Sequence, residues 1–401
     1  MNKAPGFVIR WYNSLRFKLP LIFLVLFLLI AASIFFTLHT QGQKLLDEIA
    51  YAKITQAGLK VVDELQVRTA KATTLASSLA NLAQALPADV GLHKRLIPRL
   101  LNIQGTEHFI AGGGIWPPPY QFDSGIERRS FFWGRDRQGK LRYYEDYNAP
   151  KTPGYHREEW YVPARYLAPG HAYWSKSYID PYSLLPMVTV TVPMHDAGKF
   201  IGAATVDLKL EGLHSLLEKV TRPFAGYAFA VDRNGTFLSF PDEQLARKTR
   251  QTAGDTSIIP YIKLSELAQN LPVFSSIAEI LNRENQLIQA MARDTPAFDP
   301  QLTARLAAES YQIDAREAQL ISVSLSNPLQ ERPLAKNFLF QQDYFLQQPV
   351  FVSVITMPGT FWRIITVMPY NAALHRGEEI FSRLLEVMLL AVSLPCCSLP
   401  C

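Results

Sequence analysis

One stretch of the chain, residues 155–207, gathers the side chains best suited to hold a small molecule. Its first half is rich in tyrosine, tryptophan, arginine and acidic residues and has the composition of a loop. Its second half alternates valine and threonine from Val188 to Val192, which is the period of a half-buried strand. Polar and aromatic loops on a rigid sheet are typical of ligand pockets. The pattern therefore predicts a small-molecule site.

The candidate ligand-binding residues are aromatic or charged. They are Arg157, Glu158, Trp160, Tyr161, Trp174, Tyr178, Asp180 and Asp207. Carboxylates and aromatic faces suit an ammonium group, and a guanidinium suits a carboxylate. Purely structural interpretations stay open: the tryptophans as core, Asp180 as the cap of a turn, Asp207 as the cap of a strand or helix, and Arg157 as part of a solvated charge cluster.

The same stretch resembles a known family. The residues that carry the resemblance are Trp160-Tyr161, Trp174, Tyr178-Ile179-Asp180, the strand from Met187 to Pro193, and residues 202–207. They are similar to the distal module of double Cache (dCache) sensor domains, the extracytoplasmic part of bacterial chemoreceptors, sensor kinases, diguanylate cyclases and SpoIIE-type phosphatases. The resemblance covers roughly residues 40–380. It implies an α+β fold with a long stalk helix and two tandem PAS-like antiparallel-sheet modules.

The resemblance also implies roles for individual residues. In amino-acid-binding members, an arginine two positions before Trp-Tyr helps to hold the ligand carboxylate, and a later Tyr-x-Asp and a final Asp hold the amino group. The positions that match are Trp160, Tyr161, Tyr178, Asp180 and Asp207. Here Glu158 occupies the place of the arginine, and Arg157 lies one residue earlier. In an extended segment this shift turns Arg157 away and Glu158 toward the ligand, which favours an amine, whereas a local bulge would restore Arg157.

The N-terminus has the pattern of a membrane anchor. Residues 1–18 carry basic side chains and no acid, and Leu19 to Leu38 is uncharged. Twenty such residues cross a hydrocarbon core of about 30 Å, and the basic side stays cytoplasmic. The net charge of +5 therefore reports topology, not nucleic-acid binding. A cleaved signal peptide is the alternative, but the apolar run is long for one and no cleavage site follows it.

The remaining sequence divides into segments of different pattern. We expect a cytoplasmic tail (1–18), a transmembrane helix (19–38), stalk and connecting helices (39–103), a distal PAS-like module (104–222), a membrane-proximal PAS-like module with a helical insertion (223–370), and an exit helix with an incomplete second transmembrane segment (371–401). The helices of the second module are expected on one side of its sheet. All three cysteines lie in the last six residues, so the modules contain no disulfide. The Cys/Pro ending suggests a truncated or frame-shifted product.

No enzyme signature accompanies these segments. The sequence has no GxSxG, HExxH, Walker or dinucleotide-binding motif, and its histidines lack the spacing of zinc ligands. We therefore expect no enzyme activity, cofactor, metal or nucleic-acid partner. The hypothesis is an inner-membrane sensor with a periplasmic domain that binds a small ligand such as an amine or amino acid. It would signal through its membrane helices to a cytoplasmic output domain absent from this chain, as a homodimer through the stalk helices. The alternatives are an anchored periplasmic hydrolase and a structural or assembly partner that binds no ligand.

Overall fold

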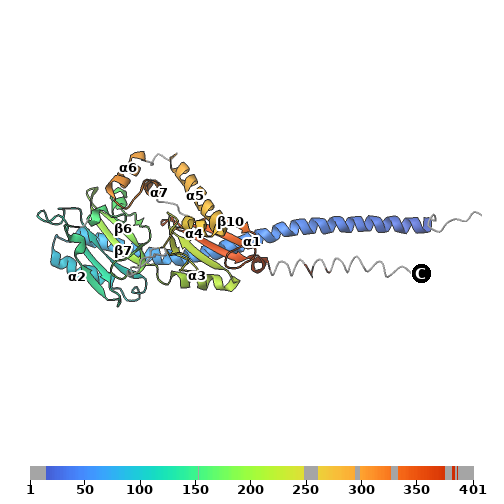
Figure 1. Cartoon of the computed structure of the whole chain (residues 1–401), viewed down its shortest axis with the longest axis horizontal. Helices are drawn as coiled ribbons and strands as arrows, with labels where there is room; N and C mark the ends of the chain where they lie inside the picture. The colour runs from blue at the N-terminus through green and yellow to red at the C-terminus, as the bar shows by residue number, and fades with distance from the viewer. Residues whose placement is uncertain are drawn as a thin grey trace, which may run out of the picture. The chain divides into compact units, whose positions relative to one another are not determined.

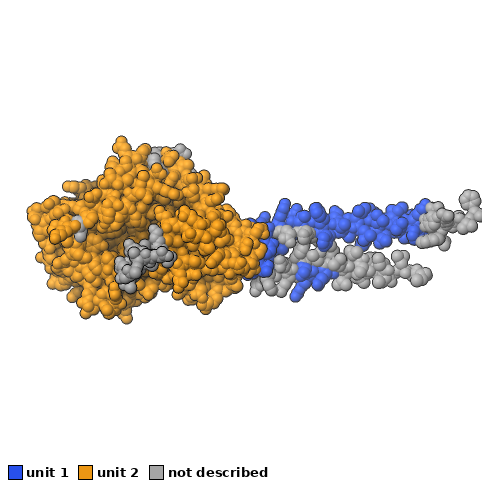
Figure 2. Space-filling view, viewed as in Figure 1, with its two compact units in different colours: residues 1–53, 370–401 blue, residues 54–369 orange. Residues whose placement is uncertain are grey.

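The computed structural model describes most of the chain. The described residues are 15–151, 153–247, 261–293, 299–326, 333–374, 382, 383 and 386. The chain divides into two compact units (Figure 2), one of residues 1–53 with 370–401 and one of residues 54–369. Both predicted sheet modules lie in the second unit, and their exact boundaries stay a prediction. The predicted incomplete membrane segment beyond residue 386 lies outside the described residues.

A single long helix opens the described chain. Helix α1 runs from Leu15 to Ala85 and joins the predicted membrane segment and the predicted stalk in one element. Among the described residues, this is the helix that is long and apolar enough to cross a membrane. Its large apolar side chains between Leu19 and Phe36 are exposed, which suits a lipid environment.

The first module is a seven-stranded antiparallel sheet (Figure 1). Its strands are β1 (Ile110–Trp116), β2 (Phe131–Arg135), β3 (Leu141–Tyr144), β4 (Tyr173–Trp174), β5 (Tyr178–Ile179), β6 (Pro186–Asp196) and β7 (Lys199–Lys209). They lie in the order β3-β2-β1-β7-β6-β4, and β5 also pairs with β6. Helix α2 (Val90–Leu101) precedes the sheet, and the Asp89 side chain caps it by accepting a hydrogen bond from the Leu92 amide at 2.7 Å. The connecting helix expected before the first module is thus present.

The second module is a five-stranded antiparallel sheet in the order β10-β11-β12-β8-β9. Its strands are β8 (Tyr227–Val231), β9 (Phe237–Ser239), β10 (Leu334–Phe340), β11 (Val350–Thr356) and β12 (Arg363–Pro369). Its helices are α4 (Leu264–Asn270), α5 (Ser275–Arg293), α6 (Pro300–Glu309) and α7 (Ala315–Ser326), and α3 (Leu213–Thr221) links the two sheets in the chain. The predicted α+β fold with two antiparallel sheets is confirmed.

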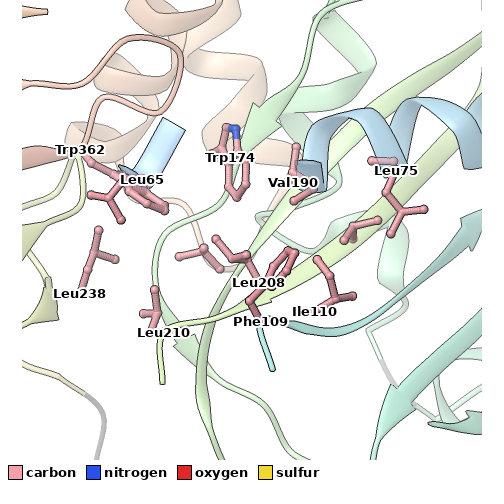
Figure 3. Packing of buried hydrophobic residues seen from close by; sticks show 14 of the residues in the cluster. Leu65, Leu75, Phe109, Ile110, Trp174, Val190, Leu208, Leu210, Leu238 and Trp362 are labelled. Carbon is pink, nitrogen blue, oxygen red and sulfur yellow. The ribbon is translucent and has the colours of Figure 1, made fainter. Parts of the chain in front are cut away.

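Helix α1 supplies a core that the two sheets share. Its buried side chains between Val61 and Ala80 form one apolar cluster with the first sheet, and this cluster continues into Ile355 and Ile364 of the second sheet. Figure 3 shows Leu65 and Leu75 of α1 beside side chains from both sheets. The helix approaches the second sheet closely at Gly58, where an added Cβ would lie 2.6 Å from Ile355 Cδ1.

The helices inserted in the second module pack against both modules. Helices α4 and α5 pack against the second sheet, in a cluster that includes Phe229 and Phe237. Helices α6 and α7 pack instead against a turn of the first module, η4 (Val162–Tyr166). Leu306 and Ile321 share a buried cluster there with Val162. The first module thus covers the apolar faces of α6 and α7, a contact that the sequence analysis did not predict.

Candidate ligand-binding site

The first sheet has two faces of different chemistry. Alternate residues of β6 and β7, such as Val190 and Val206, join the apolar cluster with α1. The residues between them face the other way, and threonine is common among them. Thr189 pairs with Asp207 across the β6–β7 register, and Thr191 pairs with Thr205. The period of two therefore places Asp207 on the face away from α1.

Asp207 is a buried acid held by a chain of hydroxyl groups. Its side chain is 5% exposed, and Thr189 Oγ1 donates to Asp207 Oδ1 at 2.7 Å. The hydroxyl of Tyr178 lies 2.7 Å from the same Thr189 oxygen. Burial raises the pKa of Asp207 to about 7, and Asp180 acts in the same direction. Sequence reasoning predicted Asp207 and Tyr178 together, and the structure brings them together through Thr189.

Asp180 is the second buried acid of this face. It accepts hydrogen bonds at 2.6 Å from both the amide and the hydroxyl of Ser183, which closes the turn between β5 and β6. Burial raises the pKa of Asp180, although the bonds from Ser183 act against that shift. The residue therefore caps a turn, as the structural interpretation expected, and also adds negative charge near Asp207.

Aromatic rings cover this acidic face. The Trp160 ring lies 4.7 Å from the Trp116 ring and 6.4 Å from the Tyr147 ring, between centroids. Trp116 and Tyr147 lie edge to face at 5.2 Å, and Trp116 Nε1 donates to Thr205 Oγ1 at 2.7 Å. The cluster continues through Phe132, Tyr144 and Tyr182. We call Trp116, Phe132, Tyr144, Tyr147, Trp160, Tyr178 and Tyr182, with Asp180 and Asp207, the aromatic–acid cluster.

The acids in and near this cluster shift the pKa of one of its tyrosines. Burial raises the pKa of Tyr147, and the charges of Glu158, Asp207 and Asp180 raise it further. Asp146 acts in the same direction, so four acids raise the pKa of this phenol. Arg142 lowers the pKa of Tyr144, a member of the cluster, but no lysine or arginine of the described residues acts on the two acids Asp180 and Asp207.

Three predicted residues lie at the edge of the cluster or outside it. Tyr161 is buried beside Trp160 and packs edge to face against Tyr155 and Phe200. Trp174 lies on the opposite face of the sheet, where its ring centroid is 5.7 Å from that of Trp362 (Figure 3). Arg157 is exposed at the end of the η3 turn (Tyr155–Arg157). The structure therefore does not bring Trp174 or Arg157 to Asp207.

The segment around Glu158 is not extended. The amides of Arg157 and Glu158 bond back to the carbonyls of Gly154 and Tyr155, which makes turns to which the period-two argument does not apply. Glu158 is half-buried, accepts a hydrogen bond from Tyr311 at 2.5 Å, and has its pKa raised by burial. Its charge nevertheless raises the pKa of Tyr147, a member of the aromatic–acid cluster.

Sequence reasoning missed several residues of the site. Trp116, Tyr147 and Thr189 were not singled out, although the Val/Thr alternation carried a signal for Thr189. Glu159, the buried acid next to Trp160, was not singled out either. It is 2% exposed and pairs with Arg233 Nη2 at 2.6 Å. No sequence signal indicates this pair, since its partners are 74 positions apart.

Two cavities formed by the described residues lie away from the aromatic–acid cluster. One of about 320 Å³ lies at the turn after β8, between α5 and α7. Another of about 500 Å³ lies between α1, Trp174 and the turn before β12. Trp174 lines this second cavity, and the other seven residues predicted for the site line neither of the two. Rings of the aromatic–acid cluster contact one another, so a ligand there must displace a side chain.

Comparison with known proteins assigns this region. Residues 97–215 match the family model described as methyl-accepting chemotaxis protein-like, first PDC sensor domain. This region is a PDC sensor domain. The sensor domain contains all eight residues predicted for the site, and the predicted family is thereby confirmed for this module. Among the described residues, no group of three or more His, Cys, Asp or Glu side chains could hold a metal ion.

Individual proteins are also similar to this chain. The methyl-accepting chemotaxis protein McpC of Bacillus subtilis (strain 168) is 32% identical over 105 residues, which is 26% of this chain and 15% of McpC. The extracellular domain of the candidate histidine kinase mmHK1S-Z2 is 18% identical, with a TM-score of 0.48 over 81% of this chain and 99% of that one. The ligand-binding domain of the Pseudomonas aeruginosa PAO1 amino-acid chemoreceptor PctC, solved with GABA, is 17% identical, with a TM-score of 0.44 over 79% of this chain and 99% of that one.

Proposed function

We propose that this chain is the input part of a membrane-anchored sensor, and that its sensor domain binds a small amine at the aromatic–acid cluster. The observation that carries the proposal is a pair of buried acids, Asp180 and Asp207, whose pKa values burial raises and on which no lysine or arginine of the described residues acts. A buried carboxylate without a countercharge favours its neutral form, and an ammonium ion would reverse that preference. Aromatic faces around the acids suit the same cation.

The cluster favours an amine over an α-amino acid. An α-amino acid brings a carboxylate, which needs a guanidinium or comparable donor. Arg157, the residue expected to supply it, is exposed, and Glu158 stands beside Tyr147 in its place. A ligand carboxylate would therefore meet further acids. A simple amine makes the favourable contacts without this repulsion.

The cluster is closed, so binding requires a local opening. The rings of Tyr144 and Tyr182 stack with centroids 3.9 Å apart, and the Tyr182 hydroxyl donates to Asp146 at 2.7 Å. This bond is exposed to solvent. Tyr182 itself lies in the turn that is closed by the hydrogen bond from Ser183 to Asp180. We propose that this turn, residues 180–185, opens to admit the ligand. If the turn does not open, the cluster is a filled part of the protein core. The chain would then be a structural or assembly partner that binds no small ligand.

The anchor and the signal follow from helix α1. Its exposed apolar segment would hold the protein in the inner membrane with the sensor domain outside, in the arrangement that the basic N-terminus favours. Leu45 and Ile49 are exposed four residues apart and so lie on one helical face, which suits pairing of stalk helices in a homodimer. The signal would pass through these helices to a cytoplasmic output domain.

A thermal-shift screen tests the ligand class. The full chain in detergent is heated with ethylamine, ethanolamine, L-alanine, GABA or acetate, alongside Asp207→Asn and a matched control, Asp123→Asn, at an exposed acid in a surface turn. We expect the two simple amines to raise the melting temperature of wild type and of the control but not of Asp207→Asn. Equal shifts in Asp207→Asn would refute the site, and shifts with alanine alone would refute the ligand class. No shift with any compound would favour the structural partner.

A further inference from the structure

Two segments that supply rings to the aromatic–acid cluster are anchored to the second sheet. Trp160 directly follows Glu159, and Tyr178 directly follows Ser177. Both anchor residues bond to the turn between β8 and β9, residues 232–235. A turn of the second module therefore holds the site of the first module at two points, each one residue away from a ring of the cluster.

The first anchor is a buried ion pair. Arg233 Nη2 lies 2.6 Å from Glu159 Oε1, and the two side chains are 5% and 2% exposed. Arg233 Nη1 donates to the carbonyl oxygen of Trp174 at 2.6 Å. The Tyr173 hydroxyl bonds to both members of the pair. One guanidinium thus bridges the segment before Trp160 and strand β4.

The second anchor involves the neighbouring turn residues and helix α7. The Ser177 amide donates to Asp232 Oδ2 at 3.3 Å, and Asn234 Nδ2 donates to Glu317 Oε1 at 2.8 Å. Lys176 Nζ pairs with the other oxygen of the same carboxylate, Glu317 Oε2, at 3.1 Å. The segment before Tyr178 is therefore tied to the turn directly and, through Glu317, indirectly.

Burial makes these contacts interdependent. A buried charge that loses its partner is strongly unfavourable, so Glu159 and Arg233 must move together. Because the pair adjoins Trp160, a shift of Trp160 around a ligand must be matched by a shift of the β8–β9 turn. Strand β8 pairs with β12, which ends at Pro369, where the chain leaves the second sheet. The contacts thus lead from the cluster to the exit of the module.

We propose that Arg233 is a positioning residue for the amine site. Through Glu159 it fixes Trp160, and through its turn it fixes the segment before Tyr178, so that ligand occupancy and the arrangement of the β8–β9 turn are coupled. The part of this inference that concerns ligand rests on the proposed function. Coupling of this kind is reciprocal: a variant that frees the turn must also weaken ligand binding.

The test is a double variant that removes both charges and leaves neither one orphaned, Glu159→Gln with Arg233→Met. The control is Lys94→Gln with Glu145→Gln, because this pair, 2.8 Å apart, joins α2 to the residue after β3 within the first module. Hydrogen exchange of the ligand-free full chain is measured first. The reporters are the amides of Tyr161 and Val162, which bond to the Glu158 carbonyl. We expect exchange at least about tenfold faster in the double variant and unchanged in the control, as for directly coupled neighbours.

Ethanolamine binding supplies the second readout. We expect its affinity to fall at least about tenfold in the double variant. In wild type, ethanolamine should change exchange at the amides of Asn234 and Thr236, which donate to Asp232, and this change should be lost in the double variant. A folded double variant with wild-type exchange at Tyr161 and Val162 would overturn the positioning role.

The two proposals fail in different ways. If wild type does not bind ethanolamine, the amine site fails, and exchange in the ligand-free chain still decides the positioning role. If the double variant does not fold, Tyr173→Phe replaces it, since this change removes only the hydroxyl that bonds to Glu159 and Arg233. Faster exchange at Tyr161 in Tyr173→Phe would support the role, and unchanged exchange would contradict it.

Discussion

Replacing Asp207 with asparagine should stabilise the ligand-free protein in a pH-dependent way. Asparagine has nearly the shape of aspartate, keeps an oxygen to accept the bond from Thr189, and carries no charge. The folded pKa of Asp207 is raised by burial from 3.8 to about 7. An acid whose pKa is raised in the folded state favours folding only while it is protonated. Its contribution is therefore fully present below about pH 4 and is lost as the pH rises through 7.

The magnitude follows from the size of the shift. Roughly three pKa units at about 1.4 kcal/mol each give about 4 kcal/mol between pH 4 and pH 8. The unfolding free energy of Asp207→Asn relative to wild type should therefore rise by up to this amount over that range. Asp180 interacts with Asp207, so part of the gain will come from relief of their repulsion.

Denaturant titrations of the full chain in detergent, followed by tryptophan fluorescence, measure the difference at pH 4 and pH 8. Asp123→Asn serves as the control, because its carboxylate is exposed, and it should show the same difference from wild type at both values. If Asp207→Asn is no more stable relative to wild type at pH 8 than at pH 4, Asp207 is solvated or already paired. The electrostatic reasoning for an amine would then be refuted.

Three further predictions concern the pocket, the sheet and the anchor. Tyr178→Phe removes the hydroxyl next to Thr189 and should weaken ethanolamine binding by about 0.5–1.5 kcal/mol in calorimetry, while an unchanged affinity would place the ligand elsewhere. Gly114→Ala would put a Cβ 2.4 Å from the Phe131 carbonyl oxygen and should lower stability by about 1–3 kcal/mol in urea unfolding; a neutral change would show that the strands can separate at that point. The full chain should stay with membrane vesicles after an alkaline wash, through residues 19–38, and release by the wash would contradict the anchor.

Much of the fold could be predicted because its signals are local. Strands β6 and β7 alternate with period two, the Asn234-Gly235 turn marks the β8–β9 hairpin, and the apolar run of α1 has the length of a membrane span. Strand register then places Asp207 opposite Thr189, so the prediction of a site around Asp207 and Tyr178 needed only the correct strand pairing.

The remaining details depend on long-range packing. Trp174 belongs to a strand of two residues, and its face is set by its pairing with Val190 and by Trp362 from the other sheet. Arg157 and Glu158 lie in turns, where alternation carries no information. Glu159 looked like a solvated acid, yet it is buried because Arg233, far along the chain, meets it. Each of these outcomes follows from a contact between distant segments.

The most direct measurement of the central claim is a crystal structure of the protein soaked or grown with ethanolamine. We expect the ammonium nitrogen within hydrogen-bonding distance, about 3 Å, of an Asp207 carboxylate oxygen and against the rings of Trp160 and Tyr147. We also expect the turn at residues 180–185 to have moved relative to the closed cluster. Ethanolamine bound in the cavity beside Arg233, or a closed and empty cluster at saturating ethanolamine, would contradict the amine site.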